Sequence, residues 1–325
     1  MKFFKTILTI FHLVVMLLLL GTLLNSIVSP HAFPYINLLS LAFPVLMILN
    51  LVLCLFWIIL LMKRAIFFIG LSLLFILPVK RWINWKSMVL EKPNLKVVTV
   101  NMKAGQLGRE EIYTYLEKTN ADVIFAQEYG SDFRVRGYEK GTAKYEIVAI
   151  NSKTRIIHQE KLDTSGNGNA FYADIEFNGK IIRLVNVYLN PFSFEKKMVK
   201  PVEDFQENKA KLKDILRKLI PTFKIHQQEI RAIRKAVDDS PYPVILAGDF
   251  NSVPNSYEYY ELGKGLTDAF VEVGRGSSTS FHEYKFPIRI DYIFTSKEIR
   301  PINYRVDRSV KISDHFPVIA EFRID

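Results

Sequence analysis

The amino-terminal part of this sequence constrains the fold most, because residues 1–93 consist almost entirely of apolar runs. Residues 7–28 form a run of 22 residues without a formal charge, and about 20 such residues cross the hydrocarbon core of a bilayer. A second run covers residues 36–62, and a third, shorter run covers residues 65–79. We therefore expect a transmembrane region with about three helices at these positions.

The charges beside these runs predict the orientation of this region. It carries +7 of the formal net charge of +10, from eight basic residues and one acid. Lys2 and Lys5 place the amino terminus in the cytoplasm, residues 29–35 lack Lys and Arg and lie outside, and Lys63 and Arg64 return the chain to the cytoplasm. With a third span the rest of the chain lies on the non-cytoplasmic side, whereas with two spans it is cytoplasmic. We expect a multi-pass integral membrane protein with three spans.

Composition narrows the class of protein further. Gly and Pro have ordinary frequencies and the single cysteine, Cys54, has no partner, which excludes a collagen-like chain and a disulfide scaffold. The excess of positive charge would ordinarily suggest a nucleic-acid binder. Here most of that excess flanks apolar runs, so it says little about the substrate.

The sequence changes character at residue 94, where short β-branched and aromatic runs begin to alternate with helical stretches. This pattern predicts an α/β domain over residues 94–325. About nine strands are too many for one flat sheet, so we expect two packed sheets flanked by helices. The expected strands are 96–101, 122–127, 146–152, 170–177, 181–189, 244–248, 288–295, 303–306 and 318–323, and the expected helices are 109–119 and much of 205–237.

Polar side chains stand at the ends of these apolar strands or within them. An ionised carboxylate in such a run is costly unless a cation compensates it. If the strand ends converge, their oxygen atoms form a cluster without thiolates, which suits a hard ion such as Mg²⁺ or Mn²⁺. The segments are VVTVNMKAG with Asn101, VIFAQEYG with Glu128, RLVNVYLNP with Tyr188 and Asn190, VILAGDFNSVP with Asp249 and Asn251, RIDYIFTS with Asp291, and ISDHFPVIAEF with Asp314 and His315.

The ordered set N…QE…Y…GDFN…IDYIF…SDHFPV resembles the endonuclease/exonuclease/phosphatase superfamily. That superfamily includes pancreatic deoxyribonuclease, abasic-site endonucleases, neutral sphingomyelinases and inositol-polyphosphate 5-phosphatases. The resemblance covers about residues 94–325 and implies a catalytic domain built as a four-layer α/β sandwich. In that fold, two packed mixed sheets are flanked by helices and present the site at one edge.

The resemblance also implies which residues bind the metal and the attacking water. Glu128 matches the principal metal-binding glutamate, with Asn101 beside it and Asp314 as a second metal-site carboxylate. Asp249 matches the aspartate that positions or deprotonates the water. Lys103 stands where several nucleases carry an acid that assists a metal, which argues against a second ion.

Further roles follow for the phosphate and the transition state. Asn251 looks like the asparagine that orients the phosphate, and Tyr188 stands where relatives carry His or Tyr near the scissile bond. Asp291 and His315 resemble an Asp-His pair in which the imidazolium stabilises negative charge in the transition state, while a general-base role for the histidine is the alternative. Asn190 is a weaker match for a substrate-binding residue.

The resulting hypothesis is a membrane-anchored, divalent-metal-dependent phosphoesterase that hydrolyses phosphodiester bonds, with nucleic acid somewhat favoured as substrate. A phospholipid or sphingolipid phosphodiesterase is the alternative, because the spans hold the site near a bilayer. A non-catalytic binding module is disfavoured because Glu128, Asp249 and His315 are all present. The expected partners are the phosphodiester substrate and the lipid bilayer, without an obligate protein partner.

Two other features have weaker implications. The segment 191–243 is rich in Lys, Arg and Glu and is expected to form helices with a solvated face of mixed charge, in preference to a membrane contact. His158, His226 and His282 have no motif context and are expected on the surface.

Overall fold

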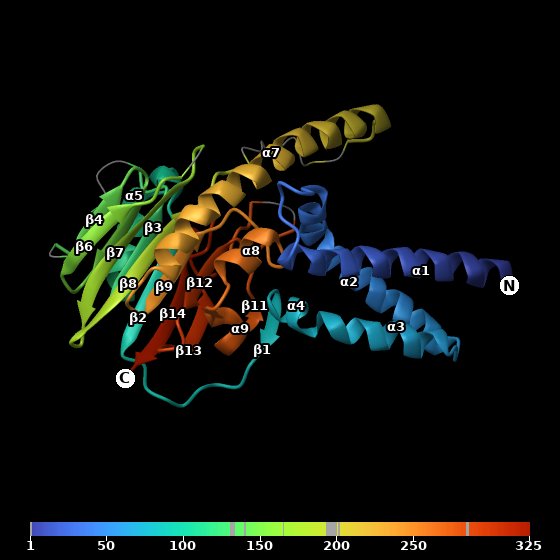
Figure 1. The fold of residues 1–325 in the computed structure, drawn as a ribbon, viewed down its shortest axis with the longest axis horizontal. Coiled ribbons are helices and arrows are strands. Elements are labelled where there is room, and N and C mark those ends of the chain that lie inside the picture. Colours follow the sequence, from blue (N-terminus) through green and yellow to red (C-terminus); the bar gives the residue numbers. More distant parts are fainter. Residues whose placement is uncertain are drawn as a thin grey trace.

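The computed structural model describes residues 2–325 except 131–133, 140, 165, 193–199, 201 and 284–285. Two six-stranded sheets pack face to face, with helices on their outer faces, and the apolar amino-terminal helices project from one end (Figure 1). The predicted four-layer α/β sandwich is thereby confirmed.

The amino-terminal region folds as helices close to the expected positions. Two of them, α1 with the turn that follows it and α2, are long and apolar enough to cross a membrane. The third expected span is helical too, but a 3-10 turn divides it into two short helices, so this span stays a prediction. The elements are α1 (Lys2–Leu23), the 3-10 turn Leu24–Ser26, α2 (Tyr35–Ile59), α3 (Arg64–Ser72), the 3-10 turn Leu73–Phe75 and α4 (Ile76–Lys80).

Strand order places the ends of non-consecutive strands side by side. One sheet has the order β13 (Ile299–Val306), β14 (Val318–Ile324), β2 (Leu95–Asn101), β3 (Val123–Gln127), β5 (Val148–Ser152) and β4 (Thr142–Tyr145). The other has the order β10 (Thr267–Asp268), β12 (Asp291–Thr295), β9 (Val244–Asp249), β8 (Lys180–Tyr188), β7 (Asn169–Phe177) and β6 (Ile156–Lys161). Both sheets are mixed, because β2 pairs with β3 and β8 with β9 in parallel, whereas their other pairings are antiparallel.

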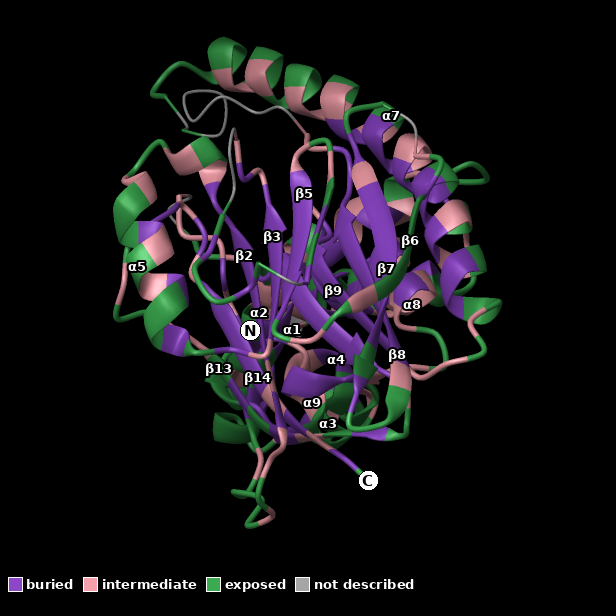
Figure 2. Ribbon diagram, turned by 90° about the vertical axis from the view of Figure 1, so that its left-hand side faces the viewer, coloured by how far each residue is buried: buried purple, intermediate pink, exposed green. Residues whose placement is uncertain are grey.

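Apolar side chains fill three layers of core. Between the sheets lie residues such as Phe125, Phe171 and Ile293. Helix α5 (Arg109–Thr119), at its predicted position, covers the first sheet, while α7 (Phe205–Asp238) and α8 (Tyr257–Leu262) cover the second. Figure 2 shows the buried sheets between helices whose outer faces are exposed.

Several strands lack a clear signal in the sequence and were not expected. β4 and β6 are edge strands, and β6 keeps most of its side chains in solvent, so alternation of apolar and polar residues is absent there. A two-stranded sheet also forms between β1 (Ile83–Trp85), directly after α4, and β11 (Arg275–Ser277).

The amino-terminal region packs against the α/β domain through specific polar contacts. Asn25 donates to the backbone oxygen of Asn255 at 3.0 Å, and Arg81 donates to the side chain of Asn255 at 2.7 Å. The backbone N–H of His31 donates to Gln227 of α7 at 2.9 Å. These helices are therefore part of the folded unit rather than a tether.

A buried ion pair fixes the loop that precedes β12. Arg289 is fully buried and donates to both carboxylate oxygens of Asp268, at 2.8 and 2.7 Å, and to the backbone oxygen of Arg81 at 3.2 Å. Asp268 also caps the short helix α9 (Ala269–Val273). The pair joins the amino-terminal region, α9 and the segment leading to Asp291.

We expect Asp268→Ala to lower the free energy of unfolding by about 3 kcal/mol, because it leaves a buried guanidinium without its counter-charge. Thermal unfolding of the full chain in detergent measures the change. Asp214→Ala is the control, since Asp214 pairs with Arg217 on the surface and its loss has little effect. Equal melting temperatures for the two variants would contradict this assignment.

Candidate active site

Strand register brings three predicted site residues into one row. Asp249 at the end of β9 lies opposite Tyr188 on β8 and opposite Asp291 on β12. His315 precedes β14 and is held by a bridge to Phe281. The row therefore lies at the edge where the two sheets meet, as predicted from the strand ends.

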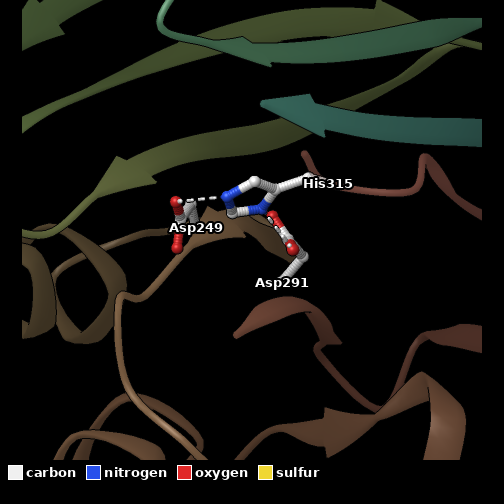
Figure 3. A group of neighbouring side chains, drawn as sticks. All are labelled: Asp249, Asp291 and His315. Atoms are coloured by element: carbon white, nitrogen blue, oxygen red, sulfur yellow. Dashed lines mark hydrogen bonds and ion pairs between the residues drawn. The ribbon is translucent and has the colours of Figure 1, made fainter. Parts of the chain in front are cut away.

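Asp249, Asp291 and His315 form a compact and almost completely buried group (Figure 3). The imidazole Nδ1 lies 2.9 Å from Asp291 Oδ2, and Nε2 lies 3.8 Å from Asp249 Oδ2. Burial by itself lowers the pKa of His315, but the charges of the two carboxylates raise this pKa to about 10. Burial raises the pKa of Asp249 to about 7, although the charge on His315 opposes this rise.

This group is geometrically compact enough to hold a metal, since its ligand atoms lie within 4.8 Å of one another. Its chemistry argues for another role. A histidine held as a cation between two carboxylates has no lone pair available for a metal. Asp291 keeps one carboxylate oxygen, Oδ1, without a hydrogen-bond partner in the described structure, and its other oxygen orients the imidazole.

Asn101 connects the two sheets at this edge. Its Nδ2 donates to Glu128 Oε1 at 2.9 Å and to Asp249 Oδ2 at 3.0 Å, while its Oδ1 accepts the backbone N–H of Lys103 at 3.0 Å. Asn101 ends β2 in one sheet and Asp249 ends β9 in the other. One amide thus connects the glutamate expected to bind the metal with the aspartate expected to act on the water.

The backbone at Glu128 and Asn251 adopts the left-handed conformation, with φ of 47° and 44°. Each such non-glycine residue costs of order 1–3 kcal/mol, and such strain clusters at functional sites. At Asn251 this turn lets its backbone N–H donate to Asp249 Oδ1 at 2.8 Å and its side chain donate to the backbone oxygen of Leu189, also at 2.8 Å.

Asp314 pairs with Lys103 at 2.7 Å. Burial alone would raise the pKa of Asp314, but His315 and Lys103 together hold it below its ordinary value. The ammonium group of Lys103 thus places a positive charge directly beside this carboxylate.

Tyr188 and Asn190 differ in their placement. The Tyr188 hydroxyl hydrogen-bonds to Glu128, and burial, with the charges of Glu128 and Asp249, raises its pKa far above the ordinary value, so it stays a donor. The side chain of Asn190 instead accepts the backbone N–H of Asn167 at 2.7 Å and does not line the cavity. The structure therefore brings together all the predicted site residues except Asn190.

A cavity of about 380 Å³ opens at this group. Its polar end is formed by the site residues, whereas its other walls are mostly apolar. One wall belongs to α2 and another to α7, so elements outside the sheets shape the site. The polar lining is Glu128, Tyr188, Asp249, Asn251, Asp314 and His315, and the remaining lining is Ser40, Leu41, Pro191, Phe192, Leu219, Phe223, Ser252, Val253, Phe281, Ile288 and Ile290.

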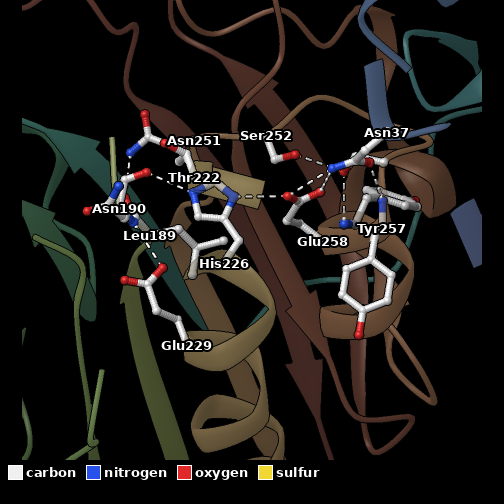
Figure 4. A network of polar contacts seen from close by, with 12 residues as sticks. Asn37, Leu189, Asn190, Thr222, His226, Glu229, Asn251, Ser252, Tyr257 and Glu258 are labelled. Atoms are coloured by element: carbon white, nitrogen blue, oxygen red, sulfur yellow. Dashed lines mark hydrogen bonds and ion pairs between the residues drawn. The ribbon is translucent and has the colours of Figure 1, made fainter. Parts of the chain in front are cut away.

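A buried polar network that we did not predict connects α7 and α8 with α2 and with the residues after β8 (Figure 4). His226 was expected on the surface, but it is fully buried, with Nδ1 2.9 Å from Glu258 Oε1 and Nε2 2.7 Å from the backbone oxygen of Asn190. Asn37 of α2 donates to both oxygens of Glu258, at 3.0 and 2.8 Å. Burial lowers the pKa of His226, but Glu258 more than offsets this, so both ring nitrogens act as donors.

A signal for His226 was present in the sequence. It lies on the same face of α7 as Phe223 and Ile230, three residues after one and four before the other. That spacing places it on the buried stripe. Its partner Glu258 follows β9 within a short helix, and Asn37 belongs to α2, so their convergence depends on the tertiary structure.

Comparison with known proteins agrees with this geometry. The endonuclease/exonuclease/phosphatase family matches residues 98–315, and a family described as a domain of unknown function matches residues 5–82. No curated protein sequence matches the chain significantly.

Several solved structures share the fold. The 3′ phosphatase NExo from Neisseria, bound to a product DNA hairpin, is 20% identical, with a TM-score of 0.52 over 70% of this chain and 99% of that one. TDP2 from D. rerio, complexed with a single-strand DNA product, is 18% identical, with a TM-score of 0.50 over 70% and 98%. An endonuclease/exonuclease/phosphatase from Beutenbergia cavernae is 15% identical, with a TM-score of 0.51 over 72% of each chain.

The chain belongs to the endonuclease/exonuclease/phosphatase family, whose model covers most of the sandwich from β2 to His315. It is a hydrolase of phosphoester bonds, in a family that depends on divalent metal ions.

We expect Asp291→Asn to lower turnover by on the order of 10²-fold or more, because it removes the charge that keeps His315 protonated and oriented. Hydrolysis of a chromogenic phosphodiester by the full chain in detergent measures the effect. Asp163→Asn, at an exposed position away from the cavity, is the matched control and should change turnover less than twofold. Equal turnover in both variants would refute a catalytic role for Asp291.

Proposed function

We propose that this protein is a membrane-anchored, divalent-metal-dependent phosphodiesterase whose substrate is a membrane lipid. One observation favours a lipid over nucleic acid as the substrate. The wall of the catalytic cavity includes Ser40 and Leu41 of α2, a helix long and apolar enough to cross a membrane. A bilayer around α2 therefore borders the site itself.

The metal-binding residues in this proposal are Glu128 and Asp314, with Asn101 holding Glu128 in position. Carboxylate and amide oxygens fit Mg²⁺ or Mn²⁺, and Glu128 is half-buried at the cavity wall. When bound, such an ion polarises a phosphate oxygen and offsets its charge.

The remaining residues act on the water and on the phosphoryl group. Asp249 has one oxygen held by the backbone of Asn251 and the other by Asn101, so it can orient a water and accept its proton. His315, kept protonated by Asp291, donates from Nε2 to the developing negative charge. Tyr188 supplies a further hydroxyl donor in the cavity.

The apolar walls favour a substrate that has a hydrocarbon portion beside its phosphodiester. Leu219 and Phe223 of α7 and Leu41 of α2 face the same cavity as the catalytic carboxylates. Removing apolar surface of a bound chain from water is worth about 25 cal/mol per Å². Nucleic acid remains the second candidate, because the Neisseria phosphatase and D. rerio TDP2, similar in fold, were solved with DNA.

The charges near Lys5 and Arg64 favour a non-cytoplasmic catalytic domain. Lys80, Arg81 and Lys86, at the end of α4 and in the segment after it, count against that placement. Arg64, at the start of α3, donates to the backbone oxygen of Lys5 at 3.3 Å, so these two basic segments lie together. Figure 1 shows these segments far from the sheets. Basic residues of short loops stay in the cytoplasm. The sheets then lie on the other side, provided that α3 and α4 cross together as a third span.

The substrate proposal predicts metal-dependent turnover of lipid phosphodiesters by the full chain in nanodiscs. The panel is sphingomyelin, phosphatidylcholine, phosphoinositides, single-stranded and duplex DNA, RNA and a chromogenic phosphodiester, each with Mg²⁺ and with a chelator. We expect lipid to be hydrolysed fastest, with activity lost on chelation and in Glu128→Gln.

Leu41→Arg separates lipid from other substrates. It places a charge in the apolar wall without touching the catalytic group, so lipid turnover should fall at least tenfold while turnover of the soluble chromogenic substrate persists. The nuclease function would be favoured if DNA were hydrolysed faster than every lipid and if Leu41→Arg left the ratio of lipid turnover to chromogenic-substrate turnover unchanged.

Sidedness is tested by cysteine labelling in a Cys54→Ser background, because Cys54 is the chain's one cysteine. We expect Asp163→Cys, on the catalytic domain, to react with a membrane-impermeant maleimide in right-side-out vesicles. Lys63→Cys, between α2 and α3, should react only in inverted vesicles. The reverse pattern would place the catalytic domain in the cytoplasm.

A further inference from the structure

Helix α7 is longer than the sheet that it covers. Its carboxyl-terminal half packs on the second sheet through residues such as Ile230 and Ile233, which are buried. Its amino-terminal half, residues 205–220, extends beyond the sheets, past the loop between α1 and α2, on the side where those helices leave the catalytic domain (Figure 1). Figure 2 shows the turns of this half as exposed or partly exposed.

An apolar stripe runs along the helix, interrupted near its amino-terminal end by Asn208 and Lys209. Its outer members are Phe205, Leu212 and Leu216, and it continues inward to Leu219 and Phe223, at spacings of seven, four, three and four residues. Exposure increases outward along it, from 2% at Phe223 and 4% at Leu219 to 56% at Leu212 and 74% at Phe205. The apolar face that is buried in the catalytic domain is therefore left open in the projecting half.

Basic residues accompany the open part of this stripe. Residues 205–220 carry five basic residues, Lys209, Lys211, Lys213, Arg217 and Lys218, against two acids, Glu207 and Asp214. Both acids are already paired, with Lys211 at 3.0 Å and with Arg217 at 3.4 Å. Lys209 and Lys213 form no ion pair with any residue that the structure describes. The free charge beside the stripe is thus positive.

We propose that residues 205–220 of α7 bind the surface of an anionic phospholipid bilayer, with the apolar stripe in the boundary between headgroups and acyl chains. An exposed apolar stripe flanked by lysines is the pattern of helices that lie in a membrane interface, and basic residues near the surface add electrostatic attraction to anionic lipid. The bilayer that surrounds α1 and α2 is on the same side of the domain. The sequence alone favoured a solvated face, but a solvated face does not account for Phe205 and Leu212.

The stripe has a second end, at the catalytic cavity. Leu219 and Phe223, which continue it inward, line that cavity. If the proposed lipid phosphodiesterase function holds, the stripe also provides an apolar path between the bilayer and the site. Binding of the bilayer itself does not depend on that function.

The test uses the full chain in nanodiscs, in a Cys54→Ser background, with an environment-sensitive fluorophore on a single cysteine. Leu212→Cys probes the stripe. Asp214→Cys is the matched control. The side chain of Asp214 is 55% exposed, and it lies on the opposite face of the helix, two residues after Leu212. We expect the probe at 212, in discs containing phosphatidylglycerol, to shift to shorter wavelength and to be at least threefold less quenched by iodide than the probe at 214.

A second experiment reverses two charges of the helix and needs no fluorophore. In the unlabelled protein, Lys209→Glu combined with Lys213→Glu should remove the hydrogen-exchange protection that residues 205–216 gain in anionic discs compared with neutral discs. Equal quenching at both positions, or exchange that does not differ between the discs, would overturn the proposal. So would protection that rises with protein concentration in detergent, because that outcome identifies a second copy as the occupant. Neither iodide quenching nor hydrogen exchange depends on enzymatic activity. A failure of the proposed catalytic function is therefore distinguishable from a failure of membrane binding.

Discussion

Burial of charge at the edge of the sandwich is the constraint on which the site depends. Asp249, Asp291 and His315 are each 5% exposed or less. An isolated ionised group at such a place is strongly disfavoured, so each must be compensated by a neighbour. The histidine is held between the two carboxylates, Asn101 binds Asp249 from the opposite sheet, and Lys103 offsets Asp314. These compensations come from both sheets, so the sandwich must be assembled before the group is electrostatically stable.

The sequence was sufficient for the parts of the fold that follow from local patterns. Buried central strands such as 123–127 are apolar runs bounded by polar residues, and α5 was placed at residues 109–119 because its apolar positions recur with helical spacing. The site was also foreseeable, because its side chains follow directly after such strands. The resemblance to a family then supplied roles that spacing alone could not assign.

Other features depend on contacts between distant segments. Asn190 carries a polar side chain at a strand end, as the other predicted site residues do. Its side chain, however, accepts a hydrogen bond from the backbone of Asn167, and its backbone contacts His226 and Glu229. Edge strands such as β6 have few buried residues and hence a weak pattern. The packing of α2 on the catalytic domain could not be read from its composition, because a lipid-facing helix and a helix packed on protein are equally apolar. Polar residues of α2 such as Asn37, whose side chain binds Glu258, were a hint of this packing.

That contact affects where the protein can act. Because Asn37 holds Glu258, Glu258 holds His226, and His226 binds the backbone of Asn190 just after β8, a chain of buried hydrogen bonds connects α2 to the catalytic edge. A flexible linker would let the domain sample a wide shell of heights above a bilayer. If α2 crosses a bilayer, as proposed, its position there sets the depth of the catalytic carboxylates, and the reachable phosphodiesters are selected by their distance from the membrane plane as well as by their chemistry.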